Sequence, residues 1–263
     1  MKARKIVLTS GKGGVGKTTA TVNIGAALAK RGHRVILVDT DIGLRNLDLV
    51  LGLEKRIVFD LVEVIEGRCQ VRQALIKDKR FESLAILPAA QTRNKDAITE
   101  DQMARLIDEL ADMADYVLID CPAGIEGGFR NAIAGADEAI VVTTPEVSAI
   151  RDADRVIGKL AEKNIPMRLI LNRIRPEMVR TGDMLSIDDV CEILSIELLG
   201  IIPDDEEIID TTNRGEPLVL GEGYRLRGIY EKIVRRLEGD LIPFTNLETP
   251  GFFGRLFGTL KAG

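Results

Sequence analysis

A glycine-rich segment near the N-terminus has the residue types and spacing of a phosphate-binding loop. It reads Gly11-Lys12-Gly13-Gly14-Val15-Gly16-Lys17-Thr18, which fits the pattern G-x-x-x-x-G-K-[ST]. Glycines let successive backbone N–H groups turn toward one anion, and a following helix adds the positive end of its dipole. Lys17 is placed to reach the β- and γ-phosphates of a nucleotide, and the Thr18 hydroxyl is placed to bind Mg²⁺. The segment therefore predicts a nucleotide phosphate site.

The loop carries a second lysine, Lys12, which the general pattern does not require. It raises the positive charge of the loop without an evident benefit to folding. The residues alone leave two interpretations open: a solvent-exposed loop lysine, or a cation that stabilises charge during phosphoryl transfer.

Aspartates follow two short apolar runs. Asp39 and Asp41 come at the end of RVILVD-T-D, and Asp120 ends the run YVLID. Because the carboxyl ends of parallel strands line one rim of a sheet, we expect these carboxylates near the nucleotide, and Asp120 has the form of a Walker B aspartate that holds the metal directly or through water. Cys121–Gly124 then forms a turn suited to sensing a γ-phosphate. Each aspartate alone fits a strand-end turn or a helix cap equally well, but the set favours a nucleotide site.

The segment Asn172-Arg173-Ile174-Arg175 indicates which base is bound. A guanine site would present Asn-Lys-x-Asp after a late strand, with the carboxylate accepting hydrogen bonds from the base. Arg175 stands in that place and cannot accept a hydrogen bond. The sequence therefore predicts adenine, and hence ATP with Mg²⁺ as the cofactors.

Short β-branched runs alternate with segments of helical periodicity, which predicts the elements that position these residues. We expect strands over 4–9, 34–39, 84–87, 116–120, 138–143, 167–171 and 198–202, and helices over 17–31, 99–113, 148–163, 186–194 and 224–237. The runs are apolar enough to be covered on both faces. They predict an α/β fold with a single doubly wound, mostly parallel sheet flanked by helices, of the P-loop NTPase class.

Composition excludes several other classes of protein. The chain has 263 residues with net charge −5, whereas a protein that coats nucleic acid is usually basic. Its three cysteines form no CxxC pair, so no disulfide framework or zinc site is expected. The single histidine, His33, excludes chemistry that needs a His pair, and we expect it to be a solvated loop residue. A secretory h-region and a run of about 18 apolar residues are both absent, so we expect a cytoplasmic protein without a spanning helix.

The C-terminal end carries an amphipathic pattern. We expect a nucleotide-binding domain over 1–239, a tether over 240–250 and an amphipathic helix over 251–263. The apolar stripe of that helix consists of Phe252, Phe253, Leu256, Phe257 and Leu260. A helix this short, weakened by Gly254 and Gly258, is expected to fold only on a surface that accepts its stripe. A membrane surface is favoured over the alternative, a helix docked on the domain.

These segments together resemble the ParA/MinD family of ATPases, whose phosphate loop is a deviant Walker A motif with an extra lysine. Within the family, DTDIGLRNLD at 39–48 and DCPAGIE at 120–126 are most similar to the MinD group, which helps to place the bacterial division septum. Similarity continues through 145–154, 180–185 and 215–217, so it covers essentially the whole chain.

The resemblance implies roles in catalysis. Lys12 would act in trans on the nucleotide of a partner subunit in an ATP-sandwiched homodimer, and Lys17 and Thr18 would act in cis. Asp41 would orient the attacking water.

The resemblance also implies roles around the nucleotide. Asp39 and Asp120 would support Mg²⁺, Asn46 would belong to the first switch, and Asn172 would contact adenine.

The resemblance finally implies partners. A MinC-type division inhibitor and a MinE-type activator would compete for a helix at 148–154, through Ser148, Arg151, Asp152 and Asp154. Anionic lipids on the cytoplasmic face of the inner membrane would receive the C-terminal helix. Two alternatives remain: a ParA-type ATPase that partitions DNA, although no specific nucleic acid is expected, and an iron–sulfur reductase ATPase, although Cys121 and Cys191 do not form a familiar pair.

Overall fold

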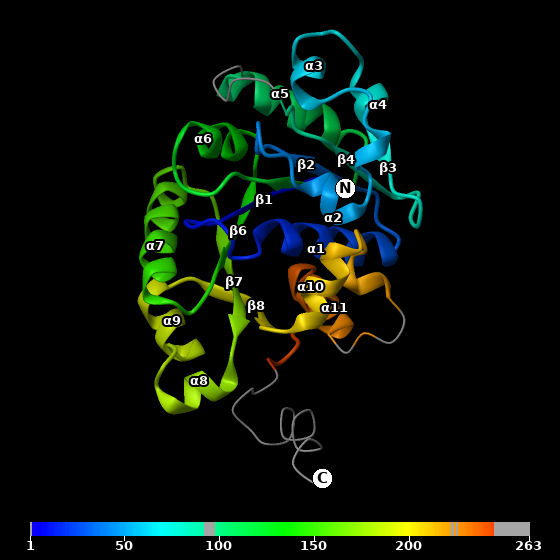
Figure 1. Ribbon diagram of the computed structural model, residues 1–263. Coiled ribbons are helices and arrows are strands. Elements are labelled where there is room, and N and C mark those ends of the chain that lie inside the picture. The colour runs from blue at the N-terminus through cyan, green and yellow to red at the C-terminus, as the bar shows by residue number, and fades with distance from the viewer. Residues whose placement is uncertain (1, 92–97, 222–223, 225, 245–263) are drawn as a thin grey trace.

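The computed structural model describes residues 2–91, 98–221, 224 and 226–244 (Figure 1). Within these residues the core is one sheet of eight strands in the order β3-β4-β2-β5-β1-β6-β7-β8. The strands are β1 Arg4–Thr9, β2 Val35–Asp39, β3 Ile76–Lys77, β4 Leu84–Leu87, β5 Tyr116–Asp120, β6 Glu138–Thr143, β7 Met167–Ile174 and β8 Glu197–Pro203. Neighbouring strands are parallel except β3, which is antiparallel to β4. The predicted mostly parallel sheet is confirmed.

Helices cover both faces of this sheet (Figure 1). They are α1 Lys17–Lys30, α2 Leu47–Leu51, α3 Leu61–Ile65, α4 Val71–Ala74, α5 Glu100–Ala111, α6 Gly127–Ala134, α7 Val147–Glu162, α8 Pro176–Thr181, α9 Ile187–Leu194, α10 Glu206–Asn213 and α11 Arg227–Leu237. Two apolar clusters result. One packs α1 and α11 onto one face, and the other packs α5, α6, α7 and α9 onto the opposite face. The fold is therefore three-layered.

The central strand β1 explains why the order of elements is fixed. Ile6 and Leu8 belong to the cluster under α1 and α11, whereas Val7 belongs to the cluster on the other face. A run buried on both faces requires neighbours on both edges and helices above and below, which parallel crossovers supply. The carboxyl ends of β1, β2 and β5 consequently meet at one rim of the sheet.

Several elements differ from the sequence predictions. All of the predicted strands form, but β7 continues to Ile174, and the last predicted helix begins at Arg227 rather than at 224. The sequence predicts none of the helices α2, α3, α4, α6, α8 and α10. The helices α2, α3, α4 and α8 have at most six residues, too few to show a helical period, whereas α6 begins with two glycines and half of the residues of α10 are β-branched, which lowers helix propensity.

The prediction that His33 lies in a loop is confirmed, but its side chain is packed against other side chains and only partly solvated. Its Nε2 lies 2.6 Å from Glu238 Oε1, and its ring packs edge-on against Tyr116 with 5.1 Å between ring centroids. The turn after α1 lies beside the end of α11, and neighbours so far away in the sequence leave no local signal.

The predicted tether begins in contact with the domain. Arg236 on α11 donates hydrogen bonds to the carbonyls of Ile242 (2.8 Å) and Pro243 (3.1 Å), and its guanidinium lies 4.0 Å from the ring centroid of Phe244. The predicted apolar stripe of Phe252, Phe253, Leu256, Phe257 and Leu260 lies outside the described residues. In the described part of the chain, every helix is too short or too polar to cross a bilayer.

An ion pair ties the first strand to its neighbour at the opposite rim. Arg4 donates to both oxygens of Glu138, at 2.8 and 2.6 Å, and both side chains are largely buried. These hydrogen bonds lower the pKa of the Glu138 carboxyl, although burial opposes them. A carboxylate with a lowered pKa stabilises the fold above its ordinary pKa of 4.5, and this contribution is lost as the pH falls through the folded-state value.

Glu138→Gln is expected to lower the free energy of unfolding by about 1 to 2 kcal/mol at pH 7, since the amide keeps the shape but not the charge. The difference from wild type should shrink as the pH is lowered below 4.5, because the wild-type carboxyl then takes up a proton. Urea unfolding at a series of pH values measures both. A difference that stays constant down to acidic pH would contradict the assignment.

Candidate functional site

The glycine-rich loop connects β1 to α1. Gly16 stands at the N-terminal cap of α1 with φ of 90°, a left-handed conformation that favours glycine. A Cβ at Gly16 would also collide with the side chain of Asn172, which donates a hydrogen bond from Nδ2 to the Val15 carbonyl at 2.7 Å. No side chain in the described part of the chain caps α1. The first turn of α1 is therefore open to an anion, as a phosphate site requires.

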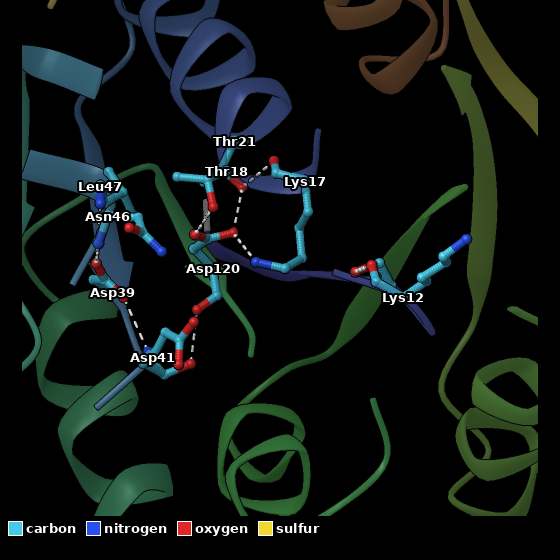
Figure 2. Close-up of polar contacts among 11 residues, drawn as sticks. Lys12, Lys17, Thr18, Thr21, Asp39, Asp41, Asn46, Leu47 and Asp120 are labelled. Carbon is cyan, nitrogen blue, oxygen red and sulfur yellow. Dashed lines mark hydrogen bonds and ion pairs between the residues drawn. The ribbon is translucent and has the colours of Figure 1, made fainter. Parts of the chain in front are cut away.

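Asp120 contacts three polar side chains of α1 (Figure 2). Its Oδ1 lies 2.8 Å from Lys17 Nζ and accepts a hydrogen bond from Thr21 Oγ1 at 3.1 Å, and its Oδ2 accepts one from Thr18 Oγ1 at 2.7 Å. Burial alone would lower the pKa of Lys17, but the charge and hydrogen bond of Asp120 raise it. Lys17 is thus held protonated at the base of the loop.

Asp39 lies beside Asp120 because β2 and β5 pair with these two residues in register. Its Oδ1 accepts a hydrogen bond from the backbone N–H of Asp41 at 2.9 Å, and its Oδ2 accepts from those of Asn46 (3.0 Å) and Leu47 (3.1 Å). Burial and the neighbouring Asp120 charge raise the pKa of Asp39 to about 7. Asp39 therefore holds both ends of the loop that carries Asp41 and Asn46.

One cavity of about 880 Å³ brings most of the predicted site together. Its predicted members are Gly13, Gly14, Gly16, Lys17, Thr18, Asp41 and Asn46. Residues that the sequence did not single out as nucleotide ligands also line it, namely Leu49, Val50, Gly52, Glu54, Arg173 and Thr212–Gly215. The cavity is large enough for a nucleotide. Asp41 lines it together with residues from several loops.

Arg173 reaches the cavity through a backbone irregularity. It has φ of 57°, and the pairing of β7 with β8 shifts between Leu171 and Ile174. Such a bulge changes the direction in which a side chain points, and the local sequence gives no signal for it. Its neighbour Asn172 holds the loop through Val15 and accepts a hydrogen bond from the Arg173 N–H at 2.9 Å. A contact between Asn172 and adenine stays a prediction.

Lys12 points away from the other lysine (Figure 2). Its Nζ lies 3.1 Å from Ser148 Oγ and 3.5 Å from Glu146 Oε2, at the start of α7, and its side chain is 44% exposed. Gly11 packs so closely on the backbone of Asp152 that a Cβ there would collide with it. The first two turns of α7 thus touch the phosphate loop directly.

The predicted partner residues share the outer side of α7. Ser148, Arg151 and Asp154 are exposed and Asp152 is half-buried, whereas Ala149, Ile150 and Ala153 are buried against the core. The helix therefore offers a polar face beside the phosphate loop.

The predicted metal ligands fit Mg²⁺ to different degrees. Thr18 Oγ1 and Asp120 Oδ2 are adjacent oxygens of the type that Mg²⁺ prefers. Both Asp39 oxygens already accept backbone hydrogen bonds, so Asp39 suits support of the site rather than direct ligation. Among the residues that the structure describes, no three His, Cys, Asp or Glu side chains gather as a metal cluster.

Comparison with known proteins agrees with this geometry. Residues 6–218 match the model of the CobQ/CobB/MinD/ParA nucleotide binding domain. The chain is 58% identical over 243 residues to the septum site-determining protein MinD of Synechocystis, covering 92% of this chain and 91% of that protein.

Solved structures give the same result. A chain of the MinC:MinD cell division protein complex of Aquifex aeolicus superposes with a TM-score of 0.86 at 50% identity, covering 93% of this chain and 99% of that chain. The septum site-determining MinD of Pyrococcus horikoshii, complexed with Mg-ADP, superposes with a TM-score of 0.80 at 31% identity, covering 90% and 96%. With the phosphate loop, Asp120 and the cavity arranged as described, the chain belongs to the CobQ/CobB/MinD/ParA family of nucleotide-binding ATPases and, within it, to the septum site-determining MinD group.

Proposed function

We propose that this protein is an ATP-dependent switch that dimerises on ATP, binds the inner membrane through its C-terminal helix and recruits a division inhibitor. Hydrolysis of ATP to ADP and phosphate ends the attached state. The proposed cofactors are ATP and Mg²⁺.

The position of Lys12 is the observation that carries this proposal. Lys17 stands in the cavity beside Asp120 and Thr18, whereas the Lys12 ammonium is on the surface, against Glu146 and Ser148 of α7. A cation in that position does not serve its own phosphates, but it is accessible to a second subunit. Delivered in trans, it would act as an arginine finger does, stabilising charge on the transferred phosphoryl group.

The residues of one subunit would divide the remaining work. Backbone N–H groups of Gly13–Gly16 and the Lys17 ammonium would bind the phosphates, and Asp41 would orient the attacking water. Thr18 and Asp120, with support from Asp39, would hold Mg²⁺, which when bound would neutralise charge on the phosphate oxygens. Because phosphoryl transfer depends on positioning and charge, a subunit without the second cation should hydrolyse ATP slowly.

The partners are proposed from the relatives and from the surface. A relative with 50% identity forms a MinC:MinD complex, so a MinC-type inhibitor is proposed to bind here as well. The polar face of α7 with Ser148, Arg151, Asp152 and Asp154 suits such a partner, and a MinE-type activator would compete for it. Because Lys12 contacts Ser148, a partner on this face would lie beside the lysine that completes the site.

The membrane anchor is proposed from the sequence of the C-terminal segment. Full burial of each stripe side chain would give at most about 1.5 to 3 kcal/mol, before backbone ordering of about 1 to 2 kcal/mol per residue is subtracted. One copy should therefore bind anionic lipid only marginally. Two copies on one dimer gain by effective concentration, by a factor of about 10² to 10⁴.

Lys12→Ala and Lys17→Ala should both abolish stimulated ATPase activity, but for different reasons. Lys12→Ala removes an exposed cation, so ATP binding and the melting temperature should stay near wild type. Lys17→Ala should lose ATP affinity and about 3 kcal/mol of stability, because it leaves the buried Asp120 charge without its cation. Calorimetric ATP titration and thermal unfolding compare the pair. Equal loss of ATP affinity in both variants would assign Lys12 to its own pocket.

Asp41→Ala should keep ATP binding and slow single-turnover hydrolysis by about 10² or more, since water positioning is separate from phosphate binding. Asp41→Asn serves as the size-matched variant and should be slow as well. Loss of Mg-ATP affinity in these variants would instead place Asp41 at the metal.

Removal of residues 250–263 should abolish ATP-dependent sedimentation with anionic vesicles and leave the melting temperature unchanged. Leu256→Glu, on the predicted stripe, should weaken sedimentation strongly, while Thr259→Glu, off the stripe, should weaken it much less. Wild type is measured with ATP, with ADP and without nucleotide. Equal binding in the three conditions rules out the switch, and a melting temperature lowered by many degrees favours a docked helix.

A further inference from the structure

At the edge of the nucleotide cavity, the ends of two helices are in contact through a pair of glycines, one from each helix end. The α2 helix ends with Gly52 at φ of 64°, and α10 is followed by Gly215 at φ of 65°. A Cβ on Gly215 would lie 2.7 Å from Gly52 Cα, and one on Gly52 would lie 3.2 Å from the Gly215 carbonyl oxygen. Only glycine fits both the left-handed backbone and this approach.

Both helix ends have the same hydrogen-bonding pattern. At α2 the N–H of Gly52 donates to Leu49 O (3.1 Å) and that of Leu53 to Asp48 O (2.9 Å). At α10 the N–H of Gly215 donates to Thr212 O (3.1 Å), and that of Glu216 to Thr211 O (3.0 Å). These are two Schellman ends, which leave the last carbonyls of each turn available to an outside donor.

Arg80 is that donor for both helices. It follows β3 in the hairpin toward β4, and its guanidinium donates from Nη2 to Leu51 O and from Nη1 to Gly215 O, each at 3.1 Å. Asp78, with a fully buried side chain, fixes the guanidinium through Nε at 3.0 Å and Nη2 at 2.6 Å. A cation at the carbonyl end of a helix is also favoured by the helix dipole. One side chain therefore bridges two helices from a hairpin outside the cavity.

The α2 helix is consequently held at both ends. Its first residue, Leu47, and the preceding Asn46 donate to Asp39, which also binds the N–H of Asp41. The carbonyl of its last residue, Leu51, accepts a hydrogen bond from Arg80, and the next residue, Gly52, packs against Gly215. Because α2 has only five residues, a displacement of its far end moves the loop from Asp41 to Leu47.

We propose that Arg80, with the glycine pair Gly52 and Gly215, is a positioning unit that holds α2 against α10 and so places the loop of Asp41 for ATP hydrolysis. This inference rests on the proposed ATPase activity and deepens it. None of the three residues needs to touch the reacting atoms. Their effect is on the rate of hydrolysis rather than on binding of the phosphates, which the glycine loop and Lys17 perform.

The test compares glycines with the same backbone strain and different contacts. Gly67 has φ of 72° and nothing within 4 Å of an added Cβ, so Gly67→Ala carries the conformational penalty alone. Gly52→Ala adds a tight contact and Gly215→Ala adds a collision with backbone. Arg80→Lys keeps a charge opposite Asp78, but one ammonium cannot span Asp78, Leu51 and Gly215 as the guanidinium does.

Single-turnover hydrolysis of Mg-ATP and the dissociation constant of ATP are measured on the full chain, with thermal unfolding alongside. Gly215→Ala is expected to slow hydrolysis about ten- to a hundredfold relative to Gly67→Ala, with Gly52→Ala and Arg80→Lys slowed less. The ATP dissociation constant should stay within about threefold in all four variants.

Two results would overturn the inference while leaving the proposed ATPase activity intact. Hydrolysis by Gly52→Ala and Arg80→Lys at the rate of Gly67→Ala would show that the junction is packing only, even if Gly215→Ala fails to fold. A loss of ATP affinity equal to the loss in rate would show that the junction serves binding. Absence of hydrolysis by the wild-type chain would refute the proposed ATPase activity and this inference with it. Failure of the proposed function is thereby distinguished from failure of the positioning role alone, in which the wild type still hydrolyses ATP.

Discussion

A buried carboxylate in the middle of the sheet is the constraint on which the nucleotide site depends. Asp120 ends β5, between β2 and β1, and is 1% exposed. Its charge is tolerated there because Lys17, Thr18 and Thr21 supply an ammonium and two hydroxyl groups from α1. These contacts fix the start of α1 against the rim, and the glycine loop must span the gap between β1 and that fixed point. The loop conformation is thus set from both sides before any phosphate binds.

The same carboxylate influences the second loop through its neighbour. Asp39 lies beside Asp120, and burial together with the neighbouring Asp120 charge raises the pKa of Asp39. Three backbone N–H groups of the loop from Asp41 to Leu47 offset part of that rise. The loop is therefore held by these hydrogen bonds to a buried carboxylate as well as by the buried side chains of Ile42 and Leu47. A cation at the rim changes the electrostatic environment of that carboxylate, which is a physical reason for the loop to respond to what the cavity holds.

The sequence predicts those parts of the molecule whose signal is local. The phosphate loop, the sheet and the carboxylates at strand ends follow from apolar runs, glycine spacing and the rule that strand ends share a rim. Arg173, Arg80 and the glycine pair could not be found in this way, because a bulge, a left-handed φ and a contact between Gly52 and Gly215 depend on pairing across the fold. The contact between His33 and Glu238 could not be predicted for the same reason, since the two residues are 205 positions apart in the sequence. The α2 helix combines both cases. Its first residues belong to the motif at 39–48, which the sequence shows, but the sequence predicts neither its helical form nor its contact with α10.

Under the proposed function, the position of Lys12 on the loop but outside the cavity would separate nucleotide binding from hydrolysis. One subunit already has Lys17, Thr18 and Asp120 assembled, so it has what phosphate binding requires. Under the proposed function, association of two subunits would both bring in Lys12 and double the membrane anchor. Dimerisation would then start both membrane attachment and the ATP hydrolysis that ends it. The protein would stay on the membrane for a useful time only if hydrolysis is slow compared with membrane binding. Under the proposed function, slow hydrolysis follows from the missing second cation, because a single subunit has Lys17 to hold the phosphates but lacks the Lys12 of a partner.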